Sequence, residues 1–267
     1  MAGVLAVFAS SASALAVTPM LFLSTVASVS AQHRFSKTYP VPRNARLMIK
    51  NYSGAIRVEV GLKNEVKVVA DMETRAVKLV PEVTDDGIVI NVVKDNAGRS
   101  DFGDVNFRII LPAGLTVDVE TKRGDITVRD VSGQMVRAKV TLDGDIELTG
   151  LRVATVLAEN MIGNILFDGE LIPGGKYRLE STKGNINVRV PGDSSFWLMA
   201  FAPTTRSIDL GGFAGRLDHS DNRRVIGNMG GGDRVVVNGQ ESSRPNLLQT
   251  SLTNESTSSL RRCGARA

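Results

Sequence analysis

Apolar and polar residues alternate in short segments between Leu115 and Val190, and a Gly-Asp/Asn-Ile triplet interrupts them four times. Successive triplets are separated by 20, 19 and 21 residues. Alternation with a period of two predicts half-buried strands, and this stretch lacks the i, i+3, i+4 spacing of an amphipathic helix. The triplets are Gly124-Asp125-Ile126, Gly144-Asp145-Ile146, Gly163-Asn164-Ile165 and Gly184-Asn185-Ile186.

A repeat of about 20 residues is typical of a stacked array, in which one unit cannot bury its own apolar face. A second apolar residue follows each isoleucine two positions later. We therefore predict an all-β fold, a parallel β-solenoid of ~20-residue coils with like positions stacked at the inter-strand spacing of ~4.8 Å. The hydrophobic interior is expected to contain an in-register column of Ile126, Ile146, Ile165 and Ile186.

Each triplet is predicted to form a tight corner between two strands. A corner with positive φ needs glycine, and a neighbouring Asp or Asn oxygen can cap the freed backbone amides. The expected structural corner residues are Gly124, Asp125, Gly144, Asp145, Gly163, Asn164, Gly184 and Asn185. Four positions before each Asp or Asn, a column of small polar residues is expected at the strand end: Thr121, Thr141, Asn160 and Ser181.

The second repeat departs from the pattern. Counted from its triplet, Arg137 and Lys139 occupy positions that are apolar in the other repeats, while Val136, Ala138 and Val140 are shifted by one residue. A slip of one residue sends side chains to the opposite face. We therefore predict a bulge or register shift in this strand, near Met135 or Leu142.

An early copy of the repeat extends from Leu47 to Val58 and is separated from the others by an insertion. The insertion contains alternating segments at 65–73, 77–83, 87–93 and 105–111, and Asp85-Asp86-Gly87 predicts a hairpin. We interpret 33–111 as an N-terminal β segment whose antiparallel strands cap the solenoid, because an open sheet edge invites aggregation.

The composition of the C-terminal half of the chain changes from a repeat region to a polar tail. Residues 112–238 are predicted to contain the solenoid repeats, with one degenerate coil at 196–210 and a long Gly- and Asn-rich loop at 211–232. Val235–Val237 is a last expected strand. Residues 239–267 are rich in Ser, Thr and Asn without periodicity, and we expect this tail to be disordered.

The first 31 residues contain no charged residue and end in Val29-Ser30-Ala31. This small-x-Ala ending predicts a signal peptide, 1–31, that is cleaved before Gln32. An uncleaved transmembrane anchor is the alternative, since the segment is long enough to span a bilayer. Cys263 is the only cysteine, which excludes an internal disulfide and a cysteine-based zinc cluster.

The amino-acid composition narrows the possible classes of function. The chain has 267 residues, of which 5% are aromatic and 26 are glycine, as suits a slim stacked β core better than a broad enzyme pocket. The net charge is +4, with Lys and Arg scattered along the chain, so no basic stripe indicates nucleic-acid binding.

The repeated columns resemble a bacterial domain family of unknown function whose proposed role is adhesion. Its members typically have an export signal, a Leu-x-Ile-x-Asn-x-x-Gly-x-Ile-x-Val opening and repeated Thr-x-x-Gly-Asp-Ile coils. Leu47–Val58 matches the opening, and Thr121–Val128 and Thr141–Leu148 match the coils. The resemblance implies a β-solenoid of the cell envelope and supplies no catalytic residues. The tail after Val237 departs from the family, where another such coil would be expected.

Acidic side chains in the repeats are candidates for catalysis or metal binding. Asp125 and Asp145 would stack one coil apart, and carboxyl groups ~5–5.5 Å apart are the arrangement of a retaining glycosidase. Asn164 and Asn185 continue the same column, however, which favours a structural corner. Asp143 and Asp145 beside Thr141 offer too few ligands for calcium. We expect no catalytic residue, no metal site and no cofactor.

Other side chains suggest binding surfaces. Trp197, with Phe196 and Phe201, would form a sugar-stacking platform if exposed, although packing in the core or at an edge is the simpler interpretation. A flat ligand-binding face would present the outward residues Thr127, Arg129, Glu147 and Asn187.

The sequence thus predicts a non-enzymatic, exported β-solenoid that acts as a structural, adhesion or interaction module. Its expected location is the periplasm, the cell surface or the extracellular space, and its expected partner is an envelope protein or a glycan, with membrane contact only through an uncleaved leader. Two alternatives stay open. One is a polysaccharide-acting enzyme that uses Asp125 and Asp145, and the other is an envelope stress sensor or regulator whose tail, 239–267, contacts a membrane protein.

Overall fold

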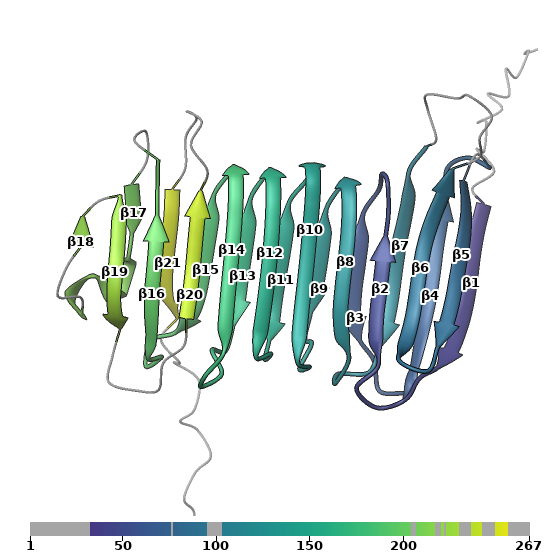
Figure 1. Ribbon diagram of the computed structural model, residues 1–267, viewed down its shortest axis with the longest axis horizontal. Coiled ribbons are helices and arrows are strands. Elements are labelled where there is room, and N and C mark those ends of the chain that lie inside the picture. The colour runs from purple at the N-terminus through teal and green to yellow at the C-terminus, as the bar shows by residue number, and fades with distance from the viewer. Residues whose placement is uncertain are drawn as a thin grey trace, which may run out of the picture. The chain divides into compact units, whose positions relative to one another are not determined.

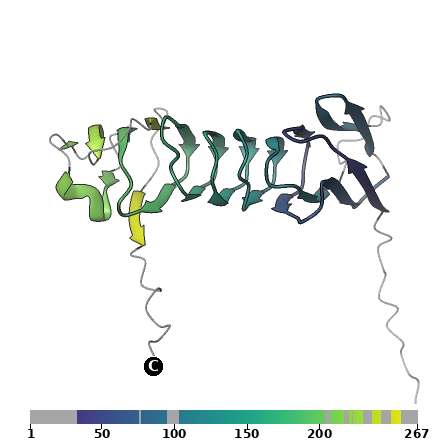
Figure 2. The ribbon, with the colours of Figure 1, turned by 90° about the horizontal axis from the view of Figure 1, so that it is seen from below.

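The computed structural model describes residues 33–75, 77–94, 103–203, 207–216, 220–221, 223–229, 236–241 and 249–255. They form two β-sheets that enclose one hydrophobic core, with the strands stacked side by side (Figures 1 and 2). The first sheet contains β1 His33–Pro40, β3 Ile56–Val60, β4 Glu65–Met72, β7 Val105–Leu111, β9 Ile126–Arg129, β11 Ile146–Leu151, β13 Ile165–Gly169, β15 Ile186–Pro191, β17 Ser207–Asp209 and β21 Gln249–Glu255. The second contains β2 Arg46–Lys50, β5 Val77–Thr84, β6 Gly87–Lys94, β8 Thr116–Arg123, β10 Met135–Asp143, β12 Thr155–Ile162, β14 Lys176–Lys183, β16 Phe196–Phe201, β18 Ser220–Asp221, β19 Arg224–Met229 and β20 Val236–Glu241. A 3-10 helix, η1, spans Gly211–Arg216.

Four coils in the middle of the stack follow the predicted repeat, since β8–β9, β10–β11, β12–β13 and β14–β15 each place one strand in either sheet. Consecutive coils pair in parallel, so that Ile146 lies between Ile126 and Ile165, and Ile165 is next to Ile186. All four isoleucines are at most 3% exposed. The structure thereby confirms the predicted all-β fold, the parallel β-solenoid and its in-register isoleucine column.

The early repeat, β2–β3, lies directly beside β8–β9, although the four strands β4 to β7 separate the two in sequence. Leu47 is opposite Val117, and Ile56 is opposite Ile126. On the other side of this coil, β6 and β7 pair with β2 and β3 in parallel. The expected antiparallel cap consists of β1 and β4 outside β7 and of β5 outside β6. The parallel placement of β6 and β7 was not predicted.

The expected irregularity in the second repeat is present in β10. Its register shifts between Val140 and Asp143 relative to both neighbouring strands. Upstream of the shift Val136 is opposite Val117 and Val156, so the apolar residues of β10 face the core. One detail of the prediction was wrong, because Val140 rather than Thr141 aligns with Thr121 and completes the column of strand-end residues.

The C-terminal part differs from the sequence prediction. β20 lies between β14 and β16, and β21 lies between β15 and β17, so this segment inserts one coil into the stack out of chain order. β21 falls in the tail that was expected to be disordered. A strand can form there because the ladder hydrogen bonds to β15 and β17 join backbone groups and do not require an alternating sequence. The expected loop at 211–232 includes η1 and β19, and Phe213 of η1 packs edge-to-face on Phe196 at 5.6 Å between ring centroids.

No helix within the described ranges is long and apolar enough to cross a lipid bilayer. The predicted signal peptide, 1–31, lies outside the described residues, as does Cys263.

Candidate functional site

The Gly-Asp/Asn corners stack on one another along one edge of the solenoid, which we call the corner edge. The corner glycines have positive φ angles, which glycine tolerates best. The values are 109° at Gly124, 144° at Gly144, 132° at Gly163 and 153° at Gly184. Space is a second constraint, because a Cβ atom at Gly144 would lie 2.3 Å from the carbonyl oxygen of Gly124 in the preceding coil.

The Asp and Asn side chains of the corner edge form a ladder of hydrogen bonds between coils. Oδ1 of Asp125 accepts the backbone N–H of Asp145 at 2.8 Å, and Oδ1 of Asp145 accepts that of Asn164 at 2.7 Å. Oδ1 of Asn164 then accepts the backbone N–H of Asn185 at 2.9 Å. In each of these coils the side-chain oxygen therefore caps a backbone amide of the following corner.

A column of buried polar residues supports the corner edge from inside. Nδ2 of Asn160 donates to the carbonyl oxygen of Gly144 at 2.8 Å, and Oγ of Ser181 donates to that of Gly163 at 3.0 Å. Asn51 holds the equivalent place in the early coil and donates to the carbonyl oxygen of Val105 at 2.9 Å. Since a buried carbonyl without a partner costs free energy, this column explains why small polar residues end these strands.

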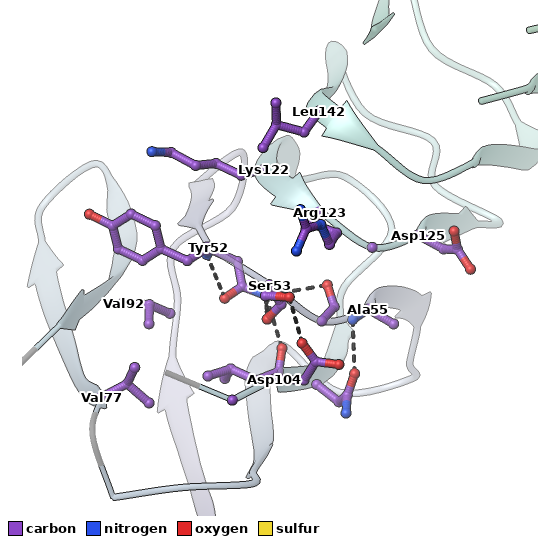
Figure 3. A pocket seen from close by; sticks show the side chains of 16 residues that line it. Tyr52, Ser53, Ala55, Val77, Val92, Asp104, Lys122, Arg123, Asp125 and Leu142 are labelled. Carbon is purple, nitrogen blue, oxygen red and sulfur yellow. Dashed lines mark hydrogen bonds between the residues drawn. The ribbon is translucent and has the colours of Figure 1, made fainter. Parts of the chain in front are cut away.

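A pocket of about 660 Å³ opens on the corner edge, where the N-terminal segment meets the first regular coils (Figure 3). Three segments far apart in sequence line it, namely 51–55, 103–106 and 122–125. Val77, Val92 and Leu142 complete the wall. Its lining therefore combines charged, amide, hydroxyl, aromatic and aliphatic groups.

Hydrogen bonds join the two N-terminal segments of the pocket wall (Figure 3). The hydroxyl of Ser53 donates to the carboxylate of Asp104, and the backbone N–H of Ala55 donates to Oδ1 of Asn106 at 2.8 Å. On the other side, Nζ of Lys122 lies 5.1 Å from the centre of the Tyr52 ring, within the range of a cation–π interaction. These contacts hold the side chains at the pocket mouth in defined positions.

The bulge in β10 contributes a further wall. It adds one residue between Val140 and Asp143, and Leu142 in this interval is 44% exposed and borders the pocket. Bulges re-aim side chains and are over-represented beside functional sites. The bulged strand β10 therefore places an aliphatic side chain at the pocket.

The outward residues named as a flat ligand face lie on the outer surface of the first sheet. Thr127, Glu147, Leu166 and Asn187 form one row across β9, β11, β13 and β15. Arg129 stands beside this row and forms an ion pair with Glu147 at 3.0 Å. This surface is regular and charged, and its apolar member is Leu166.

The aromatic residues proposed as a sugar platform are not gathered on one exposed face. Phe196 is 4% exposed and belongs to the core, while Trp197 and Phe201 are half-buried. Arg224 stacks on Phe201 at 5.7 Å from the ring centre. Packing in the core and at the edge is thus the role that the structure shows for Phe196.

Charged side chains on the outer face of the second sheet are paired across coils. Asp118 is 3% exposed and lies against Arg46 and Arg137, which cover it from neighbouring strands. The hydrogen bond from Lys139 lowers the pKa of Glu159, with Nζ and Oε2 separated by 2.8 Å. Inside the solenoid, burial raises the pKa of Tyr177, whose hydroxyl donates to the carbonyl oxygen of Val153 at 2.8 Å.

Across the ranges that the structure describes, no three His, Cys, Asp or Glu side chains are arranged to hold a metal ion. Nε2 of His33 accepts a hydrogen bond from Nε of Arg75 at 2.8 Å.

A stack of in-register coils with glycine corners and an Asp/Asn ladder places the protein in the class of parallel β-solenoids. Residues 25–207 match the family model described as Toastrack DUF4097, which is more than half of the chain. The protein therefore belongs to the toastrack DUF4097 family, as the resemblance noted from its sequence implied. No curated protein sequence matches the chain.

Three solved structures are similar to this chain to different degrees. A proposed cell adhesion protein from Clostridium sporogenes is similar with a TM-score of 0.50 and 11% identity, over 84% of this chain and 100% of that one. A proposed adhesin from Bacteroides fragilis has a TM-score of 0.35 and 10% identity, over 84% of this chain and 99% of the other. For a proposed adhesin from Parabacteroides distasonis the values are 0.31 and 12%, over 85% and 96%. At these identities the first likeness concerns the fold alone.

The pocket residues were missed by the sequence analysis. Tyr52 and Ser53 occupy the two variable positions of the Asn-x-x-Gly motif, and Asp104 closes the polar segment 95–104. Only the placement of β2–β3 against both β7 and β8–β9 brings them together with Arg123. An aromatic residue in a motif position next to a corner glycine was the available signal.

Proposed function

We propose that this protein is a non-enzymatic, exported β-solenoid that serves as an adhesion or interaction module of the cell envelope. The observation that carries the proposal is that the two stacked carboxylates act as hydrogen-bond acceptors for backbone amides. Oδ1 of Asp125 and Oδ1 of Asp145 each accept a backbone N–H of the next coil, and Asn164 performs the same task one coil later. A position that accepts either Asp or Asn in one ladder matches a structural role rather than that of a general acid or nucleophile.

Two further observations support an envelope role. The leader 1–31 ends in a signal-peptidase-like sequence, and a protein of similar fold from Clostridium sporogenes is described as a proposed cell adhesion protein. The stacked coils align their outward side chains in rows across the sheets, as suits presentation of a binding surface. With a single cysteine, Cys263, an exported form of this chain would rely on its ladder hydrogen bonds and apolar columns for stability.

The proposal is tested by offering purified protein to isolated envelope fractions and to a panel of cell-wall and capsular polysaccharides. Retention on at least one of them without release of reducing ends is expected, and the double variant Asp125→Asn/Asp145→Asn should be retained equally. Release of fragments that this double variant abolishes would establish the enzyme alternative instead. Export is tested separately by fractionating expressing cells and sequencing the mature N-terminus, which we expect at Gln32.

A further inference from the structure

We propose that the pocket at the corner edge is a binding subsite for one neutral saccharide unit of an envelope or host glycan. This inference rests on the proposed function and names the ligand class for it. The subsite combines Tyr52 and Leu142 as apolar walls with Asp104, Asn106 and Arg123 as polar groups.

The size of the pocket suits a small ligand or one unit of a longer chain. Its volume of about 660 Å³ lies within the ~300–1,000 Å³ typical of small-molecule sites. Gly54, Gly124 and Asp125 line the pocket, so it lies on the corner edge. The polar and apolar groups are mixed in its wall, as is usual where a few polar groups set the orientation of a ligand.

The charge of the pocket favours a neutral ligand. Its lining contains two basic residues, Lys122 and Arg123, and two acidic residues, Asp104 and Asp125. The two charges of each sign balance, so the lining has no net charge that would select an anion or a cation. A hydroxyl group is both donor and acceptor, so a polyhydroxylated ligand can satisfy the guanidinium and the carboxylates at once.

A sugar ring has hydroxyl groups at its rim and C–H groups on its faces. The apolar walls of the pocket suit these C–H faces. Leu142 is 44% exposed, and the bulge of β10 sets it beside the pocket instead of in a regular coil position. Tyr52 is half-buried and is held by the ammonium group of Lys122. Leu142 and Tyr52, which both line the pocket, offer such a face apolar surface that excludes water.

The pocket is also rigid, which reduces the entropic cost of binding. Asn51 is 5% exposed, and its Nδ2 donates to the carbonyl oxygens of Ser53 at 3.0 Å and of Val105 at 2.9 Å. Asn106 caps the backbone of Ala55. The segments that carry the polar groups are thus fixed to each other before a ligand arrives.

The test uses the full chain and a panel of neutral probes, namely the methyl glycosides of glucose, galactose and mannose, and N-acetylglucosamine. Glucuronic acid and glucosamine serve as charged comparators, and binding is measured by saturation-transfer NMR and titration calorimetry. We expect at least one neutral probe to bind more tightly than both comparators. Arg123→Ala and Leu142→Ser should each weaken that binding about tenfold or more, as expected for loss of a charged hydrogen bond or of a packed apolar wall.

Matched controls lie on the same edge outside the pocket. Lys183 occupies the strand-end position of Arg123 three coils further along, and Met161 is 47% exposed on the coil after Leu142. Lys183→Ala and Met161→Ser should leave binding unchanged, and the melting temperature of each variant shows that it is folded. Absence of neutral saccharide binding, tighter binding of a charged comparator, or equal binding by Arg123→Ala and Leu142→Ser would overturn the inference.

Failure of this inference is distinguishable from failure of the proposed function. If the chain is retained on envelope fractions and the pocket variants are retained equally, the subsite is wrong and the envelope role stands. If the chain is retained on no envelope fraction or polysaccharide, both are wrong.

Discussion

Oδ1 of Asp145 accepts the backbone N–H of Asn164 at 2.7 Å, one coil further along the solenoid. Asn164 repeats the contact with Asn185 at 2.9 Å, using an amide oxygen where Asp145 uses a carboxylate oxygen. The ladder therefore needs an acceptor oxygen at this position and not a negative charge. This distinction separates a structural corner from a catalytic carboxylate and leads to the first prediction.

Asp145→Asn should leave stability nearly unchanged, because the amide oxygen can accept the same hydrogen bond. Asp145→Ala should lower the free energy of unfolding by about 1 kcal/mol, the usual net value of such a bond at a partly exposed site. Chemical denaturation of both variants at neutral pH measures the difference. Equal loss of stability in the two variants would show that charge, and not acceptor geometry, matters here.

Gly144→Ala should destabilise the protein by more than about 2 kcal/mol, because positive φ penalises a side chain and the new Cβ would lie 2.3 Å from the carbonyl oxygen of Gly124. Gly174 is the matched control, with a φ of 73° but no atom within 4 Å of an added Cβ. Gly174→Ala should cost only the backbone strain, about 1 kcal/mol. Denaturant titration compares them, and similar losses would mean that the close stacking of the corners does not limit the fold.

Ile146→Ala should lower the free energy of unfolding by about 2–5 kcal/mol, as expected for truncation of a buried aliphatic side chain. Ile146 is 1% exposed and lies between two other isoleucines of the column. Thr149→Ala on the outer face of the same strand is the control and should change stability by less than about 0.5 kcal/mol. A loss of less than about 1 kcal/mol for Ile146→Ala would contradict a packed interior at this column.

The ion pair between Lys139 and Glu159 predicts a pH-dependent difference. The hydrogen bond from Lys139 holds the pKa of Glu159 below its ordinary value of 4.5, so the pair stabilises the protein above that pH and loses its effect as the pH falls through the lowered pKa. Lys139→Met should therefore reduce stability slightly at pH 7, by less than about 1 kcal/mol because both side chains are about one-third exposed.

The difference between Lys139→Met and the parent protein should shrink as the pH falls below 4.5, where Glu159 becomes protonated. Lys63→Met is the control, since Nζ of Lys63 is 3.7 Å from Glu65 and its side chain is 82% exposed. Melting curves between pH 7 and pH 3 measure both variants. A difference for Lys139→Met that grows on acidification would have the wrong sign for this ion pair.

The features that could be predicted from the sequence are those set by neighbouring residues. The alternation of apolar and polar residues predicted the strands, and the period of the triplets predicted the parallel stacking of the coils. The shifted apolar residues of the second repeat predicted a bulge near Met135 or Leu142, because a half-buried strand has only one face that can enter the core. The register shift lies at the second of these places. The role of Thr141 was misassigned because the inserted residue moves Val140 into the polar column.

The features that could not be predicted depend on pairing between distant segments. β20 and β21 enter the stack between earlier coils, and their backbone ladders leave little pattern in the sequence. The pocket arises because Tyr52, Asp104 and Arg123 meet at one corner of three different coils. No local period reveals such a meeting, so the candidate ligand site had to come from the structure.

The central claim is that equivalent side chains of consecutive coils lie in register and form the interior of the solenoid. Methyl–methyl nuclear Overhauser effects on protein labelled at isoleucine methyl groups test it most directly. The account predicts cross-peaks from Ile146 to both Ile126 and Ile165, and from Ile165 to Ile186, in line with their ladder positions. Absence of these cross-peaks in a folded sample, or rapid solvent exchange of the amides of these residues, would contradict it.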